Sequence, residues 1–504
     1  MLVQKKGRYG RRIAMKKNKY QRLIAGLLTA SLCMTMVGCG ESGKTDLETS
    51  TATIESMEPE KSNAISFSLI GGKDVMPIAG YYSSMSSIYS IDGNSMVDDL
   101  TDEYYQMIAD CGVNLITSPQ IDYHTAPSTV MKMLDLGEKY GIATCIKDST
   151  LTGTDGKVNS DLTLEEATAR ISEYSRHPAF AGVFLYDEAR SPYYVPSDGT
   201  HDLSVYADMS KVLVEDLNVW CYMNSLGWVR PNDFAMFEKY MEEYCSTQSL
   251  KNISATHYPF KDTGILEGDH YLLTKMTYLY YSLKYDVPWW SFIQAGGQWN
   301  DTGKYFESID LYPNEWQFNW NVHTSLAFGA TGIHYFPLSQ PYFFAYETED
   351  TFDFERNGLI GAWGNKNQWY YYAQNVNKHI AVIDEVLMNS VCKGIMVTGK
   401  TSKSDMQKAN ETRDISEYGL LIEGNSWREI ADVSGDAVIG CFNYQGKTAL
   451  YVANYSYEYA QKIDLTFVSD CKVKMVQNAK TSYVEGKGIT LDMPAGDGVL
   501  LVFE

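Results

Sequence analysis

The sequence predicts a protein of the α/β class, a (β/α)8 TIM barrel followed by a C-terminal antiparallel β-sandwich. Between about residues 75 and 390, a short apolar run, a loop and an amphipathic helix recur eight times. In "CGVN", "YGIAT" and "FGATGI", a Gly separates a helical pattern from the next apolar run, where it relieves the strain of a left-handed helix end. After residue 390, apolar runs follow one another with turns and no convincing helix, which is typical of an all-β domain.

Eight apolar runs are the predicted barrel strands. They occupy residues 77–82, 113–117, 142–147, 181–186, 219–224, 253–258, 288–293 and 332–336. Strands that alternate with helices pair in parallel through right-handed crossovers, and eight units over roughly 250 residues fit a closed barrel. An open, doubly wound sheet is the alternative, but it usually needs fewer units, and no Gly-rich phosphate loop follows the first strand.

Helical periodicity is clearest after the eighth strand. Apolar residues recur there at gaps of three and four, at Trp369, Ala373, Val376, Ile380, Ile383 and Leu387. Beyond residue 390 we predict six strand-like stretches, at residues 392–399, 437–456, 461–468, 471–478, 488–493 and 498–504. We also predict a partly irregular lead-in around residues 400–430 and a hairpin turn at Gln445 and Gly446. The expected domains are therefore the barrel at 65–390 and an accessory sandwich at 391–504.

The N-terminal segment predicts that the protein is exported from the cytoplasm. Residues 1–38 carry nine Lys or Arg and no acid, and the apolar run at 23–37 is too short and too polar for a stable spanning helix, as in a signal peptide. The segment ends "MVGCGES", which resembles a bacterial lipobox; the resemblance implies cleavage before Cys39 and lipidation there. An ordinary secretion signal is the alternative. Residues 39–64 are mostly polar and predict a flexible tether, so we expect an extracytoplasmic protein that meets the membrane only through its lipid.

The net charge narrows the classes of binding partner that we expect. The net charge is −21, and the basic leader accounts for nine of the positive charges, so the remainder is more acidic still. A nucleic-acid partner is not expected, because phosphate binding needs a basic patch. No Cys-x-x-Cys pair is present, and we expect neither a metal nor a cofactor.

Candidate site residues follow from the rule that such barrels place their sites at the C-terminal ends of the strands. In strand order they are Tyr81 and Tyr82; Asp122 and His124; Asp148; Asp187 and Glu188; Asn224; His257 and Tyr258; Gln294 and Trp299; and Tyr335. This set is rich in aromatic, amide and carboxyl groups and poor in cations. A phosphorylated substrate would need cations or a Gly-rich nest, so a carbohydrate is the expected partner.

The adjacent acids Asp187 and Glu188 are the strongest candidates. Two acids at the end of an apolar strand repel each other and gain nothing from burial, which indicates a role in the site. Asp122 and Asp148 also fit a structural role as helix caps or ion-pair partners. We expect Glu315, at a predicted helix start, to be structural because an acid there favours the helix dipole.

The stretches "HPAFAGVFLYDEA" and "FNWNVHTSLAFGATGIHYFPL" resemble the barrel of clan A glycoside hydrolases, closest to relatives of the β-galactosidase barrel. This resemblance implies that Glu188 is the general acid/base and that Asp187 fills a position usually held by Asn. It also matches His257 and Tyr258 to the sixth strand. Gln294 stands where the resemblance predicts a nucleophilic Glu. A second carboxylate would then come from elsewhere: Asp187, Asp148, Asp122, or a loop acid such as Asp301 or Glu347.

The predicted function is a surface-anchored glycoside hydrolase that acts on an oligo- or polysaccharide. A non-catalytic carbohydrate-binding lipoprotein on the same barrel is the first alternative, because Gln294 is a poor nucleophile. A metal-dependent hydrolase using Asp122, His124 and His257 is the second. It is disfavoured because the first strand lacks the His-x-His pair that such barrels usually carry.

Overall fold

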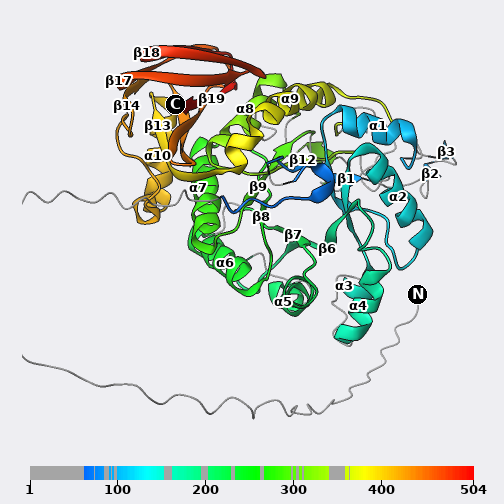
Figure 1. Cartoon of the computed structure of the whole chain (residues 1–504). Helices are drawn as coiled ribbons and strands as arrows, with labels where there is room; N and C mark the ends of the chain where they lie inside the picture. The colour runs from blue at the N-terminus through cyan, green and yellow to red at the C-terminus, as the bar shows by residue number, and fades with distance from the viewer. Residues whose placement is uncertain are drawn as a thin grey trace, which may run out of the picture. The chain divides into compact units, whose positions relative to one another are not determined.

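In the computed structural model, the chain forms a ring of parallel strands surrounded by helices and then an antiparallel sheet, and the following residues are described (Figure 1). They are 62–72, 74–83, 99–152, 162–194, 202–228, 233–260, 266–296, 312–339, 358–361 and 364–504, with the backbone alone of 90–91, 94–95, 299–301 and 306–308. The predicted signal segment, Cys39 and nearly all of the predicted tether lie outside these residues. Within them, no helix is both long enough and apolar enough to cross a membrane.

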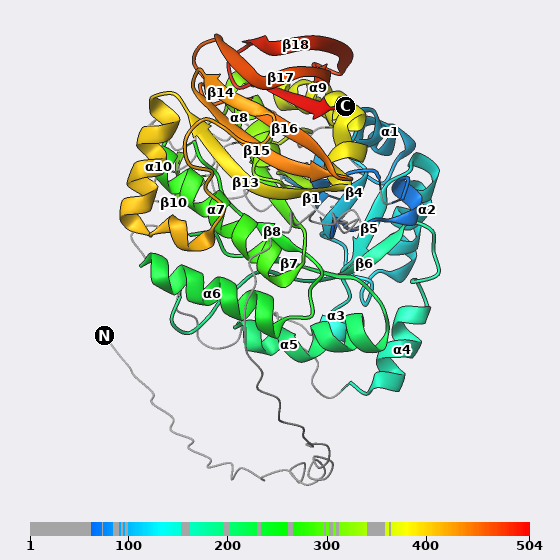
Figure 2. The same cartoon turned by 60° about the vertical axis from the view of Figure 1, so that its left-hand side comes forward.

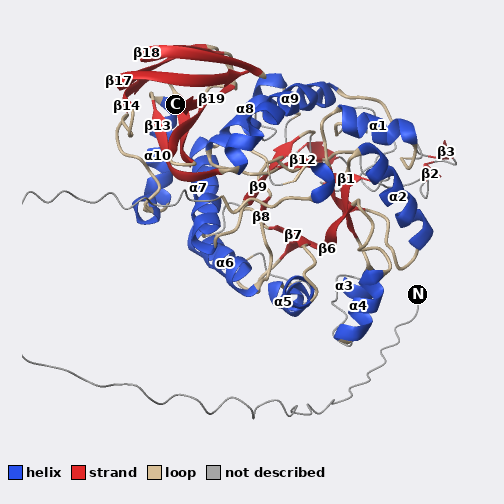
Figure 3. Ribbon diagram, viewed as in Figure 1, coloured by secondary structure: helices blue, strands red, loops and turns tan. Residues whose placement is uncertain are grey.

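All eight predicted barrel strands are confirmed, and the TIM-barrel prediction with them. They are β1 (Ile78–Ser83), β4 (Leu115–Pro119), β5 (Ala143–Ile146), β6 (Phe180–Ala189), β7 (Cys221–Ser225), β8 (Ile253–Ala255), β9 (Trp289–Gln294) and β12 (Ile333–Phe336). Neighbouring strands pair in parallel, and β1 pairs with both β4 and β12, which closes the ring. Helices surround these strands (Figure 3).

Helices of the described barrel region have capping residues at several of their ends. They are η1 (Ser68–Ile70), α1 (Asp102–Asp110), α2 (Pro127–Tyr140), α3 (Ser149–Thr152), α4 (Leu164–Ser172), α5 (Leu203–Lys211), η4 (Val212–Asp216), α6 (Phe234–Thr247), α7 (Gly268–Tyr285), α8 (Glu315–Ala327) and α9 (Gln368–Met388). Thr163 and Glu166 form a capping box at the start of α4, and α2 ends at Gly141 with a φ of 71°. The six apolar residues predicted to share one face of α9 are all buried. Two short hairpins, β2 (Ser90–Ile91) with β3 (Asn94–Ser95) and β10 (Trp299–Asp301) with β11 (Phe306–Ser308), follow β1 and β9.

The segment just before β1 closes the N-terminal end of the barrel, which we call the floor. Phe67 and Ile70 form a cluster there with Ala79, Leu115, Ala143 and Trp290, residues at or near the first positions of their strands. The Phe67 ring lies 5.0 Å from the Trp220 ring and 6.4 Å from that of Trp290. The end opposite the floor, where the strands finish, is the mouth.

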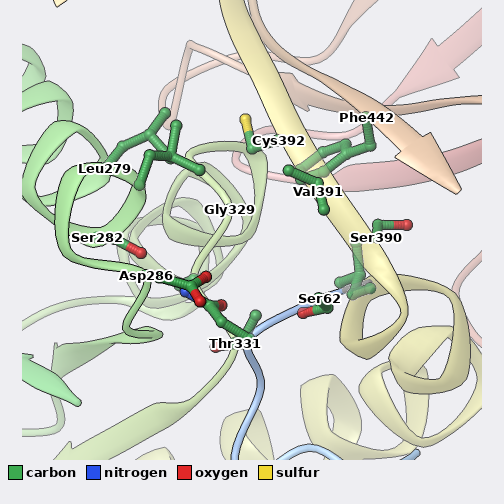
Figure 4. Close-up of a pocket in the computed structure, with 14 residues that line it drawn as sticks. Ser62, Leu279, Ser282, Asp286, Gly329, Thr331, Ser390, Val391, Cys392 and Phe442 are labelled. Atoms are coloured by element: carbon green, nitrogen blue, oxygen red, sulfur yellow. The ribbon is translucent and has the colours of Figure 1, made fainter. Parts of the chain in front are cut away.

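A small cavity of about 70 Å³ lies at the floor end of the barrel (Figure 4). It is lined by Ser62, by Asp286 and Thr331, which precede β9 and β12, and by residues such as Ser390 and Cys392 from the strand that follows α9. Ser62, the first described residue, therefore lies at the end of the barrel away from the strand ends that would form a site.

The C-terminal domain is a β-sandwich made from one antiparallel sheet that folds over itself, as predicted (Figure 2). Its strands are β13 (Ser390–Thr398), β14 (Ile430–Ser434), β15 (Ala437–Tyr444), β16 (Lys447–Asn454), β17 (Gln461–Gln477), β18 (Lys480–Met493) and β19 (Gly498–Phe503). The first half of β17 pairs with β14 and its second half with β19, and one buried apolar cluster draws residues from all seven strands. The runs at 461–468 and 471–478, predicted as two strands, are one strand. The predicted turn at Gln445 and Gly446 is confirmed.

The prediction of an irregular segment without a helix around residues 400–430 is wrong. Helix α10 (Thr401–Thr412) and the short η6 (Ile415–Tyr418) lie there. Only Ser402, Met406 and Ala409 of α10 are buried, so its sequence carries too little apolar periodicity to mark a helix. Instead, the Asp436 carboxylate accepts hydrogen bonds from the first two N–H groups of α10, at 2.7 and 2.9 Å. The helix lies against α7 of the barrel (Figure 2).

Helix α8 contacts the sandwich through β16 and the loop that follows it, in addition to the packing of α10 on α7. Trp320 donates from Nε1 to the carbonyl of Tyr455 at 2.8 Å, and His323 Nδ1 lies 2.7 Å from the Tyr451 hydroxyl. The Tyr457 ring packs edge-on against Phe260, in the loop after β8, at 5.3 Å. The sandwich therefore supports a loop at the mouth of the barrel.

The floor cluster predicts a stability effect at Phe67. Phe67→Ala should lower the free energy of unfolding by about 3 kcal/mol, because it leaves a cavity against Trp220 and Trp290. Phe67→Leu, which keeps most of the apolar volume, is the matched control and should cost less than half as much. Urea unfolding measures both changes; equal costs for the two variants would contradict the packing described here.

Candidate active site

The acid pair sits on a β-bulge at the mouth. Asp187 of β6 pairs with Asn224 of β7, and the next paired residues are Ala189 and Ser225, so Glu188 is one residue extra. Its φ is 56°, a left-handed conformation that costs a residue other than Gly on the order of 1–3 kcal/mol. Successive side chains of a regular strand point to opposite faces, whereas a bulge re-aims one of them. The bulge therefore allows both carboxyl groups to serve the same site.

A hydrogen-bonded circuit connects the two acids across three strand ends. Asn224 donates from Nδ2 to Asp187 Oδ1 at 3.1 Å and to Thr256 Oγ1 at 2.6 Å. The side chain of Thr256, which directly follows β8, hydrogen-bonds the Glu188 carboxyl. The carboxyl groups are thus fixed by neutral groups from β7 and β8, and both acids keep partial solvent access.

The two carboxyl groups differ in acidity. Burial, reinforced by the negative charge of Asp187, raises the pKa of Glu188 to about 7, while Thr256 and Arg190 oppose this shift. Burial also raises the pKa of Asp187, against the effect of Tyr81 and Asn224. Because the charge of Asp187 acts on Glu188, the pair favours an ionised Asp187 beside a protonated Glu188 in mildly acidic to neutral solution. Such a divergence is typical of an acid/base pair.

Aromatic rings form a wall next to the acids. Tyr81 lies 5.0 Å from Tyr82, Tyr82 lies 5.4 Å from Phe336, and Phe336 lies 5.3 Å from Tyr258. Burial and the charges of Asp187 and Glu188 raise the pKa of Tyr82, so its hydroxyl remains neutral near both acids. Tyr82 also has a left-handed backbone, with a φ of 56°. The structure thus brings the predicted residues Tyr81, Asn224 and Tyr258 together with the acid pair.

Gln294 is part of a structural clamp. Its Oε1 accepts a hydrogen bond from the N–H of Phe260 at 3.1 Å, and its Nε2 donates to the carbonyl of the same residue at 3.0 Å. The side chain is 2% exposed. The residue that stands in the predicted nucleophile position therefore fixes the loop after β8 with both ends of its amide.

Asp148 and Asp122 hold neighbouring backbone and helices. Asp148 is fully buried and accepts hydrogen bonds from Arg170 Nε at 2.8 Å, Arg170 Nη2 at 3.3 Å and the Tyr174 hydroxyl at 3.2 Å. This ion pair fastens α4 near the end of β5. Asp122 accepts from the N–H groups of His124 and Ser149, at 2.8 and 3.1 Å. Both contacts agree with the structural role considered for these acids.

Three other predicted site residues lie apart from the acid pair. Tyr335 is buried on the outer side of β12, where its hydroxyl donates to Asn377 Oδ1 of α9 at 2.6 Å, so its expected substrate contact is corrected to a packing role. His257 packs against His270 and Tyr271 of α7, at 4.8 and 5.2 Å. His124 is exposed and lies 3.0 Å from Thr150.

The remaining predictions concern Trp299, three further acids and a metal-binding site. The side chains of Trp299, Asp301 and Glu347 lie outside the described residues. Glu315 begins α8 directly after its capping residue Asn314, in keeping with a structural role. Across the described part of the chain, no three His, Cys, Asp or Glu side chains form a metal-binding group, and β4 and β8, which precede His124 and His257, lie opposite each other in the ring.

Thr256 and Arg190 are site residues that the sequence reasoning missed. Each directly adjoins a predicted strand end or candidate: Thr256 precedes His257, and Arg190 follows Ala189. Position alone could have placed Thr256 among the candidates. Nothing in its sequence context indicates that it lies between Asn224 and Glu188.

Comparisons with known proteins identify the fold. No family model and no curated protein matches the chain. Gan42B, a GH42 β-galactosidase from G. stearothermophilus, is similar with a TM-score of 0.51 and 8% identity, over 88% of this chain and 100% of that one. A β-galactosidase from Marinomonas ef1 gives 0.43 and 12%, over 67% and 65%, so this chain covers less than two thirds of it. A GH51 arabinofuranosidase from Xanthomonas axonopodis pv. citri gives 0.41 and 10%, over 89% and 98%. The likeness to Gan42B, at 8% identity, agrees with the TIM-barrel fold described above.

The raised pKa of Glu188 predicts a pH-dependent stability cost. The folded protein holds this proton up to about pH 7, whereas the unfolded chain loses it near the ordinary Glu value of about 4.3. The contribution of Glu188 to the free energy of unfolding therefore falls as pH rises between these values. Glu188→Gln removes the effect, so the variant should gain about 1–3 kcal/mol relative to the parent between pH 5 and pH 8.

Urea unfolding at both pH values measures this difference. Glu165→Gln, at an exposed position of α4, is the control and should show the same difference from the parent at either pH. A Glu188→Gln difference that is independent of pH would contradict the assigned protonation state.

Proposed function

We propose that the protein is a glycoside hydrolase that acts on an oligo- or polysaccharide, with Glu188 as general acid/base. The observation that carries this proposal is the bulged strand end, where a strained backbone presents a carboxyl with a pKa of about 7 beside a second carboxyl. A protonated acid near neutral pH can donate to the oxygen of a departing sugar or aglycone, and afterwards its carboxylate can activate water.

The surroundings of the acid pair suit a sugar. The rings of Tyr82, Tyr258 and Phe336 can pack against the apolar C–H faces of a pyranose, while Asn224 and Thr256 belong to a polar network beside them. Arg190 is the one cation among the groups that shift the pKa of Glu188. This mixture of flat apolar and neutral polar groups matches an uncharged polyol.

Glu188→Gln should lower kcat/KM on a disaccharide or alkyl glycoside by about 100- to 10,000-fold, because the amide cannot donate the proton. On an aryl glycoside with an acidic leaving group, the bond-breaking step should suffer less, since that leaving group needs no protonation. For the parent protein, kcat/KM should fall as pH rises through about 7, where Glu188 loses its proton. Initial rates over pH 4–9 on a matched pair of substrates measure all three effects.

Glu165→Gln provides the control for purification and charge. Undiminished turnover by Glu188→Gln on the unactivated substrate would exclude Glu188 as the acid. The clamp between Gln294 and Phe260 favours a second candidate, a carbohydrate-binding protein without catalysis. Calorimetric binding of a glycan that is never cleaved, by parent and variant alike, would support this second candidate.

We also propose that the protein is anchored to the outer face of a bacterial cell membrane through a lipid on Cys39, on the basis of the "MVGCGES" segment. Cys39→Ser should abolish the incorporation of labelled fatty acid that the parent protein shows, because the modified thiol is lost. Labelling of cells that express each form measures this loss. Equal labelling of the variant and the parent would contradict lipidation at Cys39.

A further inference from the structure

We propose that the sugar cleaved by this site carries an acetamido group at carbon 2, that the carbonyl oxygen of this group is the nucleophile, and that Asp187 holds its N–H. This inference rests on the proposed hydrolase function and adds a substrate class and a mechanism to it. Three features of the mouth carry it: the adjacency of the two carboxyl groups, the fixed orientation of Asp187, and the clamp at Gln294.

The adjacency of the acids matches two neighbouring substituents of one sugar ring. Asp187 and Glu188 are consecutive, and the charges of both raise the pKa of Tyr82. If Glu188 donates to the oxygen on carbon 1, a carboxylate on the next residue lies within reach of the substituent on carbon 2. The bulge makes this pairing possible, because a regular strand would direct one of the two carboxyl groups to the other face.

Asp187 is held as a hydrogen-bond acceptor. Asn224 donates to its Oδ1 at 3.1 Å and is itself fixed by Thr256 at 2.6 Å, which sets the orientation of the carboxylate. An ionised carboxylate has about four acceptor sites, so it can accept a substrate N–H in addition to Asn224. Its negative charge is also suited to a nitrogen that becomes positive during the reaction.

Gln294, at the end of the seventh barrel strand, holds the loop after β8 by hydrogen bonds. Both ends of the Gln294 amide are bound to the backbone of Phe260, whose ring in turn packs against Tyr457 of the sandwich loop. In this assignment Asp187 binds the substituent on carbon 2 and is not the nucleophile that attacks carbon 1. Displacement at carbon 1 needs a nucleophile on the face opposite the leaving oxygen, which a 2-acetamido group trans to that oxygen provides.

The resulting reaction balances without another reagent. The proton of Glu188 passes to the glycosidic oxygen as the bond from carbon 1 to that oxygen breaks, and the acetamido oxygen forms a new bond to carbon 1. The positive charge that develops at the nitrogen is held by Asp187 through the N–H. Water then attacks carbon 1, the bond to the acetamido oxygen breaks, and Glu188 takes the proton of the water. Two inversions at carbon 1 retain its configuration.

The test compares three aryl β-glycosides with the same aglycone and with acetamido, hydroxyl or free amino groups at carbon 2. The parent protein should cleave the acetamido substrate at least about 100-fold faster than the other two, as expected when a nucleophile is lost. Stepwise fluorination of the acetyl group should slow the reaction progressively, because fluorine withdraws electrons from the carbonyl oxygen. Asp187→Asn should lower the rate on the acetamido substrate by about 100- to 1,000-fold.

A second measurement does not depend on turnover. A thiazoline analogue of the cyclic intermediate should bind the parent protein in calorimetry and bind Asp187→Asn at least 10-fold more weakly, with the melting temperature of the variant as a check of folding. Equal rates on the hydroxyl substrate, insensitivity to fluorination, or preference for the free amine would each overturn the inference while leaving a hydrolase in place. If no glycoside in a wider panel is cleaved faster by the parent than by Glu188→Gln, the proposed function itself fails.

Discussion

Two like-charged groups meet at the end of β6 because this strand carries one residue more than β7 opposite the bulge at Glu188. A left-handed backbone at a Glu and the repulsion between neighbouring carboxyl groups both oppose folding. The Asn224 and Thr256 hydrogen bonds offset part of this cost, and protonation of Glu188 removes much of the repulsion. The pairing of β6 with β5 on one side and with β7 on the other holds this arrangement in place.

The rest of the molecule supports this strand end from two directions. From the barrel, Asp148 and Arg170 fix α4 beside β5, and Gln294 fixes the loop that carries Phe260. From the sandwich, Tyr457 packs on Phe260, and Trp320 of α8 binds the backbone of the same sandwich loop. The sandwich thus contributes rigidity to the mouth, and this contribution explains a contact between domains without requiring a ligand in the sandwich.

The fold was largely predictable because eight apolar runs, separated by helical periodicity, leave few arrangements other than a closed parallel ring. The direction in which each side chain points at the strand ends was less predictable. In the pair His257 and Tyr258, Tyr258 joins the aromatic wall while His257 packs on α7, and Tyr335 faces α9. A sequence of short strands does not fix which residue of a neighbouring pair points inward, and it gives no sign of a bulge. Helix α10 was missed because contacts with Asp436 and α7 hold it, whereas its own apolar residues are few.

The position of Ser62 at the floor has a consequence for access. The described chain begins at the end of the barrel farthest from the acid pair, with Phe67 and Ile70 sealing the space between. The segment that leads into β1 therefore packs at the floor and leaves the strand ends at the mouth clear. A ligand that enters the mouth does not have to pass the chain that leads into the barrel.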